Sequence, residues 1–143
     1  MESVMKTKAI AFVVVILLAA GVASAQSTDT IKFRTPFAFA IGDKLVPAGE
    51  YRVSVVSPTG TLSFRSDDGH VSVLIGSLPK QGKETAERIK LIFHRYGVHY
   101  YMSEIWTPGY KTGRTVKPGT TELELAKNDK PQSVTLYADG VGQ

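Results

Sequence analysis

Apolar and polar residues alternate in short stretches through most of the chain after residue 30. This spacing of two places alternate side chains on one face of a strand and predicts half-buried β-strands. It recurs twice early in the chain, first from Ile31 to Ile41 and again from Tyr51 to Val55. In the first stretch the apolar residues fall at odd positions: Phe33, Phe37, Phe39 and Ile41. Pro36 interrupts that stretch, so we expect an edge position or a bend there.

Turn sequences separate these stretches. Gly42-Asp43 is suited to a two-residue hairpin turn, and Pro47-Ala48-Gly49 to a tight reversal before the next strand. Ser57–Gly60 is a further turn. We expect strands at Thr61–Ser66 and His70–Ser77, joined as a hairpin through Asp67-Asp68-Gly69, since Asp-Gly tolerates the left-handed backbone that such a connection needs.

The strongest hairpin pattern joins Arg88–Arg95 to Val98–Thr107 through Tyr96-Gly97. With those two residues as the loop, His94 lies opposite His99, Ile92 opposite Tyr101 and Lys90 opposite Ser103. The other face is then expected to be the core side, and it carries Ile89, Leu91, Phe93, Tyr100, Met102 and Glu104, with Trp106 beyond.

The remaining segments are less regular. Residues 79–87 predict a loop or a single helical turn, and residues 107–119, rich in Gly and Pro, predict the longest unstructured stretch. Thr121 and Glu124 fit a capping box that opens a short helix ending before Pro131, although Leu123 and Leu125 would also suit a strand. A last strand is expected at Ser133–Ala138, with residues 139–143 frayed. Seven strands or so with one short helix near the C-terminus predict an all-β fold, an antiparallel β-sandwich or a small β-barrel.

The N-terminal pattern is different and indicates export. Lys6 and Lys8 precede an apolar run over residues 9–20, and Ala23-Ser24-Ala25 is a small-residue cleavage site. Residues 1–25 therefore predict a signal peptide, and residues 26–143 a single β domain. The apolar run is shorter than the ~20 residues that a membrane-spanning helix needs, so we expect cleavage and no stable membrane span after processing. The expected location is the periplasm or the extracellular space.

Composition narrows the function classes. The chain has no cysteine, so disulfides and a lipidated N-terminal Cys are excluded. Its formal charge of +4 falls to +3 when Lys6, Lys8 and Glu2 are removed, and acids are interspersed with the bases. This pattern does not favour nucleic acid as a partner. Residues 109–114 do not match a phosphate-binding loop, and we expect no cofactor.

Two groups of side chains could carry chemistry in the predicted hairpin. His94 and His99, if they face each other, could bind a transition metal with a third ligand, but none is evident, so we predict no metal site. Glu104, on an apolar face next to Trp106, would have a raised pKa suited to an acid catalyst. The alternative is that Glu104 pairs with a neighbouring Arg or Lys, or lies at the rim of the sheet.

A ligand-binding surface is predicted in the loop over residues 108–119, which carries three bases and no acid. An anionic polymer or a sugar could bind there, with aromatic side chains as stacking surfaces. The candidate ligand-binding residues are Trp106, Tyr110, Lys111 and Arg114, with Lys117 nearby.

Several motifs resemble those of a family of small exported β-rich proteins of soil bacteria. They are Pro36-Phe37-Ala38-Phe39, Val46-Pro47-Ala48-Gly49-Glu50-Tyr51, Phe93-His94-Arg95-Tyr96-Gly97 and the stretch from Tyr100 to Trp106. The resemblance covers most of residues 26–143. It implies a shared β fold and export, and brings no activity, substrate or catalytic residue.

Neither a Gly-x-Ser-x-Gly motif nor a catalytic Cys is present. The sequence therefore favours a non-catalytic binding or structural module of the cell envelope, with an envelope component, a glycan or a small ligand as its partner. The alternative is a secreted hydrolase that acts on a polysaccharide or lipid, with Glu104, or His94 and His99, in its site.

Overall fold

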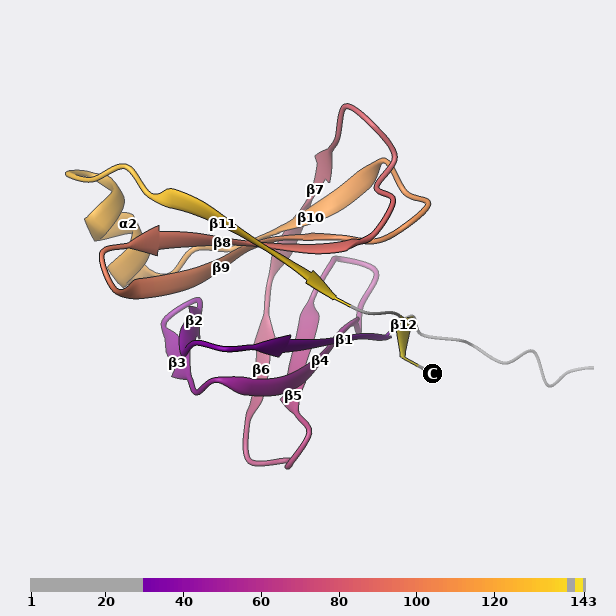
Figure 1. Ribbon diagram of the computed structural model, residues 1–143, viewed down its shortest axis with the longest axis horizontal. Helices are drawn as coiled ribbons and strands as arrows, with labels where there is room; N and C mark the ends of the chain where they lie inside the picture. The colour runs from indigo at the N-terminus through magenta and orange to yellow at the C-terminus, as the bar shows by residue number, and fades with distance from the viewer. Residues whose placement is uncertain (1–29, 139–140, 143) are drawn as a thin grey trace, which may run out of the picture.

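A computed structural model describes residues 30–138 and 141–142 of the chain, so the predicted signal peptide lies outside the described residues. Within them the fold is a β-sandwich of two open sheets that do not close into a barrel (Figure 1). This confirms the predicted all-β class. No helix in this part of the chain is long and apolar enough to cross a membrane.

The first sheet, sheet A, contains five antiparallel strands in the order β12-β1-β4-β5-β6. Their bounds are Val141–Gly142 for β12, Thr30–Thr35 for β1, Gly49–Val55 for β4, Leu62–Ser66 for β5 and Ser72–Ile75 for β6. The hairpin turn between β5 and β6 is at the predicted place, and Gly69 takes the positive φ of 78° that the Asp-Gly sequence permits. The prediction that residues 139–143 fray is wrong for β12, which pairs with β1.

The second sheet, sheet B, has the order β11-β8-β9-β10-β7. Its strands are Gln132–Ala138 (β11), Ile89–Tyr96 (β8), His99–Trp106 (β9), Thr112–Val116 (β10) and Ser77–Gln81 (β7). A hairpin of β2 (Phe39–Ile41) and β3 (Lys44–Val46) joins β9 through one parallel bridge. The expected strand from Ile31 to Ile41 is therefore two strands in different sheets, and the bend between them begins at Pro36, as predicted.

Two predicted loops contain strands. Residues 77–81 form β7 at the edge of sheet B. Pro79 has no N–H to donate to a neighbouring strand, and an edge strand tolerates this. The expected strand His70–Ser77 divides at Gly76 into β6 and β7, which belong to different sheets. The stretch over residues 107–119 contains β10, which pairs with both β7 and β9. Together with β2, β3 and β12, the strands β7 and β10 raise the strand count in the described residues from the expected seven to twelve.

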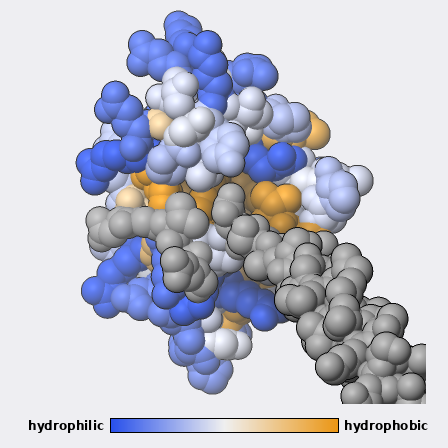
Figure 2. Space-filling view, turned by 90° about the vertical axis from the view of Figure 1, so that its right-hand side faces the viewer, coloured by the Kyte–Doolittle hydropathy of each residue, from blue (hydrophilic) through white to orange (hydrophobic). Residues whose placement is uncertain are grey.

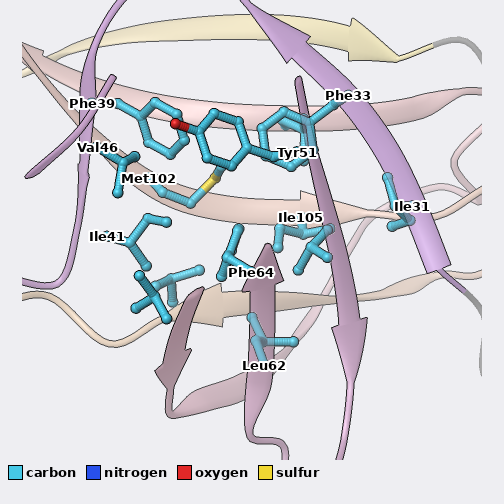
Figure 3. Packing of buried hydrophobic residues seen from close by; sticks show 14 of the residues in the cluster. Ile31, Phe33, Phe39, Ile41, Val46, Tyr51, Leu62, Phe64, Met102 and Ile105 are labelled. Atoms are coloured by element: carbon cyan, nitrogen blue, oxygen red, sulfur yellow. The ribbon is translucent and has the colours of Figure 1, made fainter. Parts of the chain in front are cut away.

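The core lies between the two sheets and is rich in aromatic rings (Figure 3). Phe39 packs edge-on against both Tyr51 and Phe93, with ring centroids 5.3 and 5.4 Å apart, and Phe33 stacks on Tyr51 at 5.7 Å. Edge-on and offset contacts at these spacings are the favourable geometries for aromatic pairs. The inward direction predicted for Phe33, Phe37, Phe39 and Ile41 is confirmed, although Phe37 is only partly buried against the core.

One short helix, α2 (Thr120–Ala126), closes one end of sheet B. The predicted capping box is wrong, because the N-cap residue is Gly119 and it makes no side-chain cap bond. Instead the carboxylate of Asp43, in the turn between β2 and β3, accepts hydrogen bonds from the Thr121 N–H and the Thr120 hydroxyl, both at 3.3 Å. A residue distant in sequence thus caps the helix.

Candidate functional site

A β-bulge in β9 decides which side chains reach the outer face of sheet B. The β8–β9 hairpin turns at Gly97-Val98, and its register shifts between Ile92 and Phe93, leaving Ser103 as the extra residue. Beyond the bulge, Ile92 pairs with Glu104 and Lys90 with Trp106. Bulges re-aim side chains in this way. Glu104 and Trp106 therefore share the outer face with His94, whereas the predicted register placed both on the core side.

The predicted pairing of His94 with His99 is also wrong, because the hairpin turns at Gly97-Val98 and not at the predicted Tyr96-Gly97. His94 pairs with Tyr101, and His99 with Tyr96 at the end of the hairpin. Across the described residues, no group of three potential ligand side chains could hold a metal ion.

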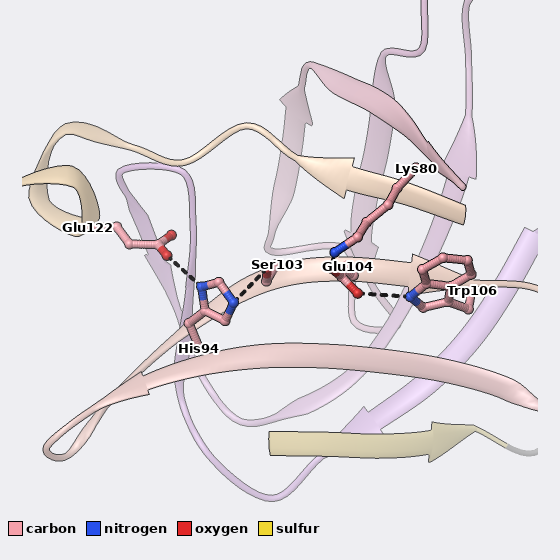
Figure 4. A network of polar contacts seen from close by, with 6 residues as sticks. All are labelled: Lys80, His94, Ser103, Glu104, Trp106 and Glu122. Carbon is pink, nitrogen blue, oxygen red and sulfur yellow. Dashed lines mark hydrogen bonds and ion pairs between the residues drawn. The ribbon is translucent and has the colours of Figure 1, made fainter. Parts of the chain in front are cut away.

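Glu104 is buried on this outer face and forms an ion pair with the half-exposed Lys80 (Figure 4). Its carboxylate accepts a hydrogen bond from Lys80 Nζ and another, 3.0 Å long, from Trp106 Nε1. Burial alone would raise the pKa of Glu104, but the two hydrogen bonds and the Lys80 charge outweigh burial and hold the pKa below its usual value. The prediction of a raised pKa is wrong, and the alternative that Glu104 pairs with a neighbouring base is confirmed.

Trp106 is clamped and offers no free ring face. The residue is only 7% exposed. A Cβ added at Gly113 would lie 2.6 Å from the indole, and one at Gly82 would lie 2.8 Å from it, so both backbones press on the ring. Lys90 Nζ lies 5.5 Å from the ring centroid. The indole therefore does not offer the exposed stacking surface that the sequence predicted. It is held in place by the backbone at Gly82 and Gly113.

A second polar group lies farther along the same face and ties α2 to the sheet (Figure 4). Nδ1 of His94 in β8 lies 3.2 Å from Oε2 of Glu122 in α2, and Nε2 lies 3.2 Å from the Ser103 hydroxyl in β9. Ser103 and Glu122 are each 7% exposed. An ionised carboxylate can only accept hydrogen bonds, so with a neutral ring Nδ1 donates to Glu122 and Nε2 accepts from Ser103.

The predicted ligand-binding residues lie on separate surfaces. Trp106 lies on the outer face, whereas the Arg114 guanidinium turns to the edge of the core and donates to the Ser77 hydroxyl at 2.6 Å. Arg114 and Tyr110 line one end of a 270 Å³ cavity between the sheets, where apolar side chains lie between the polar outer layers (Figure 2). Lys111 is exposed and does not line this cavity.

An open groove of about 870 Å³ lies on the outer face of sheet B. The loop between β7 and β8 forms one wall, and Trp106 and Glu104 lie at its base. Its lining carries four cations, Lys80, Lys83, Arg88 and Lys90, and three acids, Glu84, Glu87 and Glu104. The Arg88 guanidinium lies 4.5 Å from the ring centroid of Tyr137, which is half exposed.

Sequence reasoning missed Lys80, Ser103 and Glu122. Lys80 lay in a segment expected to be a loop, and Ser103 has no nucleophile motif around it. Ser77 and Lys80 have the spacing Ser-x-x-Lys, which occurs in some serine acyl-transfer enzymes. In a strand, however, residues three apart point to opposite faces, and these two side chains bind different partners, so they do not act together. The signal for the bulge was the apolar spacing in β9, which changes from two (Tyr100 to Met102) to three (Met102 to Ile105).

Comparison with known proteins adds no relative: no protein-family model, curated protein or solved structure matches the chain.

Proposed function

We propose that this protein is an exported binding module of the cell envelope whose groove on sheet B binds an acidic glycan. The observation that carries the proposal is the open groove of about 870 Å³, lined by aromatic and basic side chains. Export is an expectation from residues 1–25, and the groove suggests what the exported domain meets there.

The charges in the groove favour a ligand with carboxylates. Glu104 is neutralised by Lys80 and is buried, so it presents little negative charge to a ligand. Glu84 and Glu87 offset two of the remaining three cations, which leaves the groove weakly positive. Arg88 lies next to the half-exposed ring of Tyr137, where a sugar ring can pack while its carboxylate meets a cation, and Lys90 supplies a second cation in the same groove. A weakly positive, open groove fits a chain of uronic acid units better than a compact polyanion.

Isothermal titration calorimetry tests this proposal with two oligosaccharides of equal length, an oligogalacturonate and a neutral malto-oligosaccharide. We expect only the acidic glycan to bind, with an affinity that falls as salt rises. Lys90→Ala should weaken binding about 5- to 10-fold, on the scale of one charge-assisted hydrogen bond. Lys32→Ala removes an exposed cation from sheet A and serves as the control. Equal binding of both glycans, or none, would contradict the proposal.

A further inference from the structure

We propose that Ser103, His94 and Glu122 form a nucleophile, a base and an orienting acid that hydrolyse small acyl esters. The three residues come from β9, β8 and α2, and two hydrogen bonds of 3.2 Å join them in the order hydroxyl, imidazole, carboxylate (Figure 4). That order and these atoms, Oγ to Nε2 and Nδ1 to a carboxylate, are the arrangement by which serine hydrolases activate a hydroxyl.

The backbone at Ser103 supports this role. Ser103 is the unpaired residue of the bulge, and bulges are over-represented next to active sites because they turn a side chain away from the regular pleat. In a regular strand, a residue that follows Met102 would lie on the opposite face from it and be paired across the hairpin. Here Ser103 is left out of the ladder, and its hydroxyl points to the imidazole.

Burial indicates the substrate class. Glu122 and Ser103 are each 7% exposed, whereas the His94 side chain is 35% exposed. A substrate therefore approaches over the exposed edge of the imidazole, and only a small acyl group reaches the hydroxyl. Ile92 and Glu104, which neighbour His94 and Ser103 on this face, line the large groove, so the alcohol part of the ester can extend into it. We therefore expect acetyl esters of alcohols to be substrates.

The reaction balances with water as the only co-reactant. The Ser103 oxygen forms a bond to the ester carbonyl carbon while its proton passes to His94 Nε2. The bond to the leaving alcohol then breaks, and that alcohol takes the proton from Nε2, which leaves an acyl-serine. Water repeats the attack, giving its proton to Nε2, and the serine oxygen leaves and recovers that proton as the carboxylic acid is released. Glu122 accepts the Nδ1 hydrogen bond throughout and orients the ring.

A fluorophosphonate probe tests the nucleophile directly, because attack forms a phosphorus–oxygen bond on the serine and expels fluoride. Intact mass and peptide mapping of the purified protein should show one adduct on Ser103. Release of p-nitrophenol from p-nitrophenyl acetate should fall at least 100-fold in Ser103→Ala and in His94→Gln, as expected for loss of the nucleophile or the base. The Gln amide can still bond to both neighbours but cannot take up the proton.

Ser63→Ala is the matched control, because Ser63 lies on β5 in the other sheet and is also 7% exposed. It should leave both readouts unchanged. Circular dichroism and the fluorescence of the single tryptophan confirm that each variant is folded. The proposal is overturned if folded protein takes no adduct on Ser103, or if Ser103→Ala hydrolyses the ester as fast as the unaltered protein. This result would leave the proposed glycan binding untouched, because calorimetry measures it without any acyl transfer.

Discussion

Replacing Gly113 by Ala tests the packing that fixes the floor of the groove. The added Cβ would lie 2.6 Å from two carbons of the Trp106 indole and 2.9 Å from the carbonyl oxygen of Ile105. Carbon atoms pack best at about 3.5–4.0 Å, so either the ring or strand β10 must move by about 1 Å. Gly113 has no positive φ, and the steric overlap is therefore the main source of strain. Overpacking of this kind typically costs about 1–3 kcal/mol of stability.

Urea unfolding followed by the fluorescence of Trp106, the sole tryptophan, measures this cost. Gly76→Ala is the control, because a Cβ there has nothing within 4 Å and the backbone again has no positive φ. We expect that variant to be neutral or more stable by about 0.4–1 kcal/mol, through the lower entropy of its unfolded chain. If Gly113→Ala unfolds within about 0.5 kcal/mol of the control, the clamp around Trp106 is refuted.

Two further predictions concern charged groups that hold the fold. The folded-state pKa of Glu104 lies below the usual 4.5, so its contribution to stability is present above that pH and is lost as the pH falls. Glu104→Gln should thus lower the free energy of unfolding by about 1 kcal/mol at neutral pH, a value that allows for the half-exposed Lys80, and by progressively less from pH 6 to 3. A difference in unfolding free energy that does not change with pH would contradict this. Asp43→Ala should cost about 1 kcal/mol in thermal or urea unfolding through loss of the α2 cap, while Asp43→Asn, which can still cap, should cost less. Equal losses in the two Asp43 variants would show that the capping bond is unimportant.

The parts of the fold that follow local rules could be predicted from the sequence. Alternation identified the inward face of Phe33, Phe39 and Ile41, and Pro36 marked the bend between sheets. The Asp-Gly turn fixed the β5–β6 hairpin. In each case the backbone preference of a few neighbouring residues agrees with the tertiary structure.

The parts of the fold that depend on residues distant in the sequence could not be predicted. The strands β7 and β10 stabilise each other through five paired residues, but Pro79 interrupts β7 and Gly113 interrupts β10, and both residue types are depleted in strands. The candidate site depends even more on context. One inserted residue in β9 moved Glu104 to the outer face, and Glu122 became a partner of His94 only because Asp43 and the sheet hold α2 in place.

The central claim is that the outer face of sheet B, beside Trp106, is where this protein meets its ligand. The chain has one tryptophan, so a ¹⁵N-correlated NMR spectrum contains a single indole N–H signal, from the group that donates to Glu104 at the base of the groove. Titration with an oligogalacturonate should shift this signal and those of Arg88 and Lys90 saturably, with one common dissociation constant. An indole signal that stays fixed while residues of the inter-sheet cavity or sheet A shift would contradict the account.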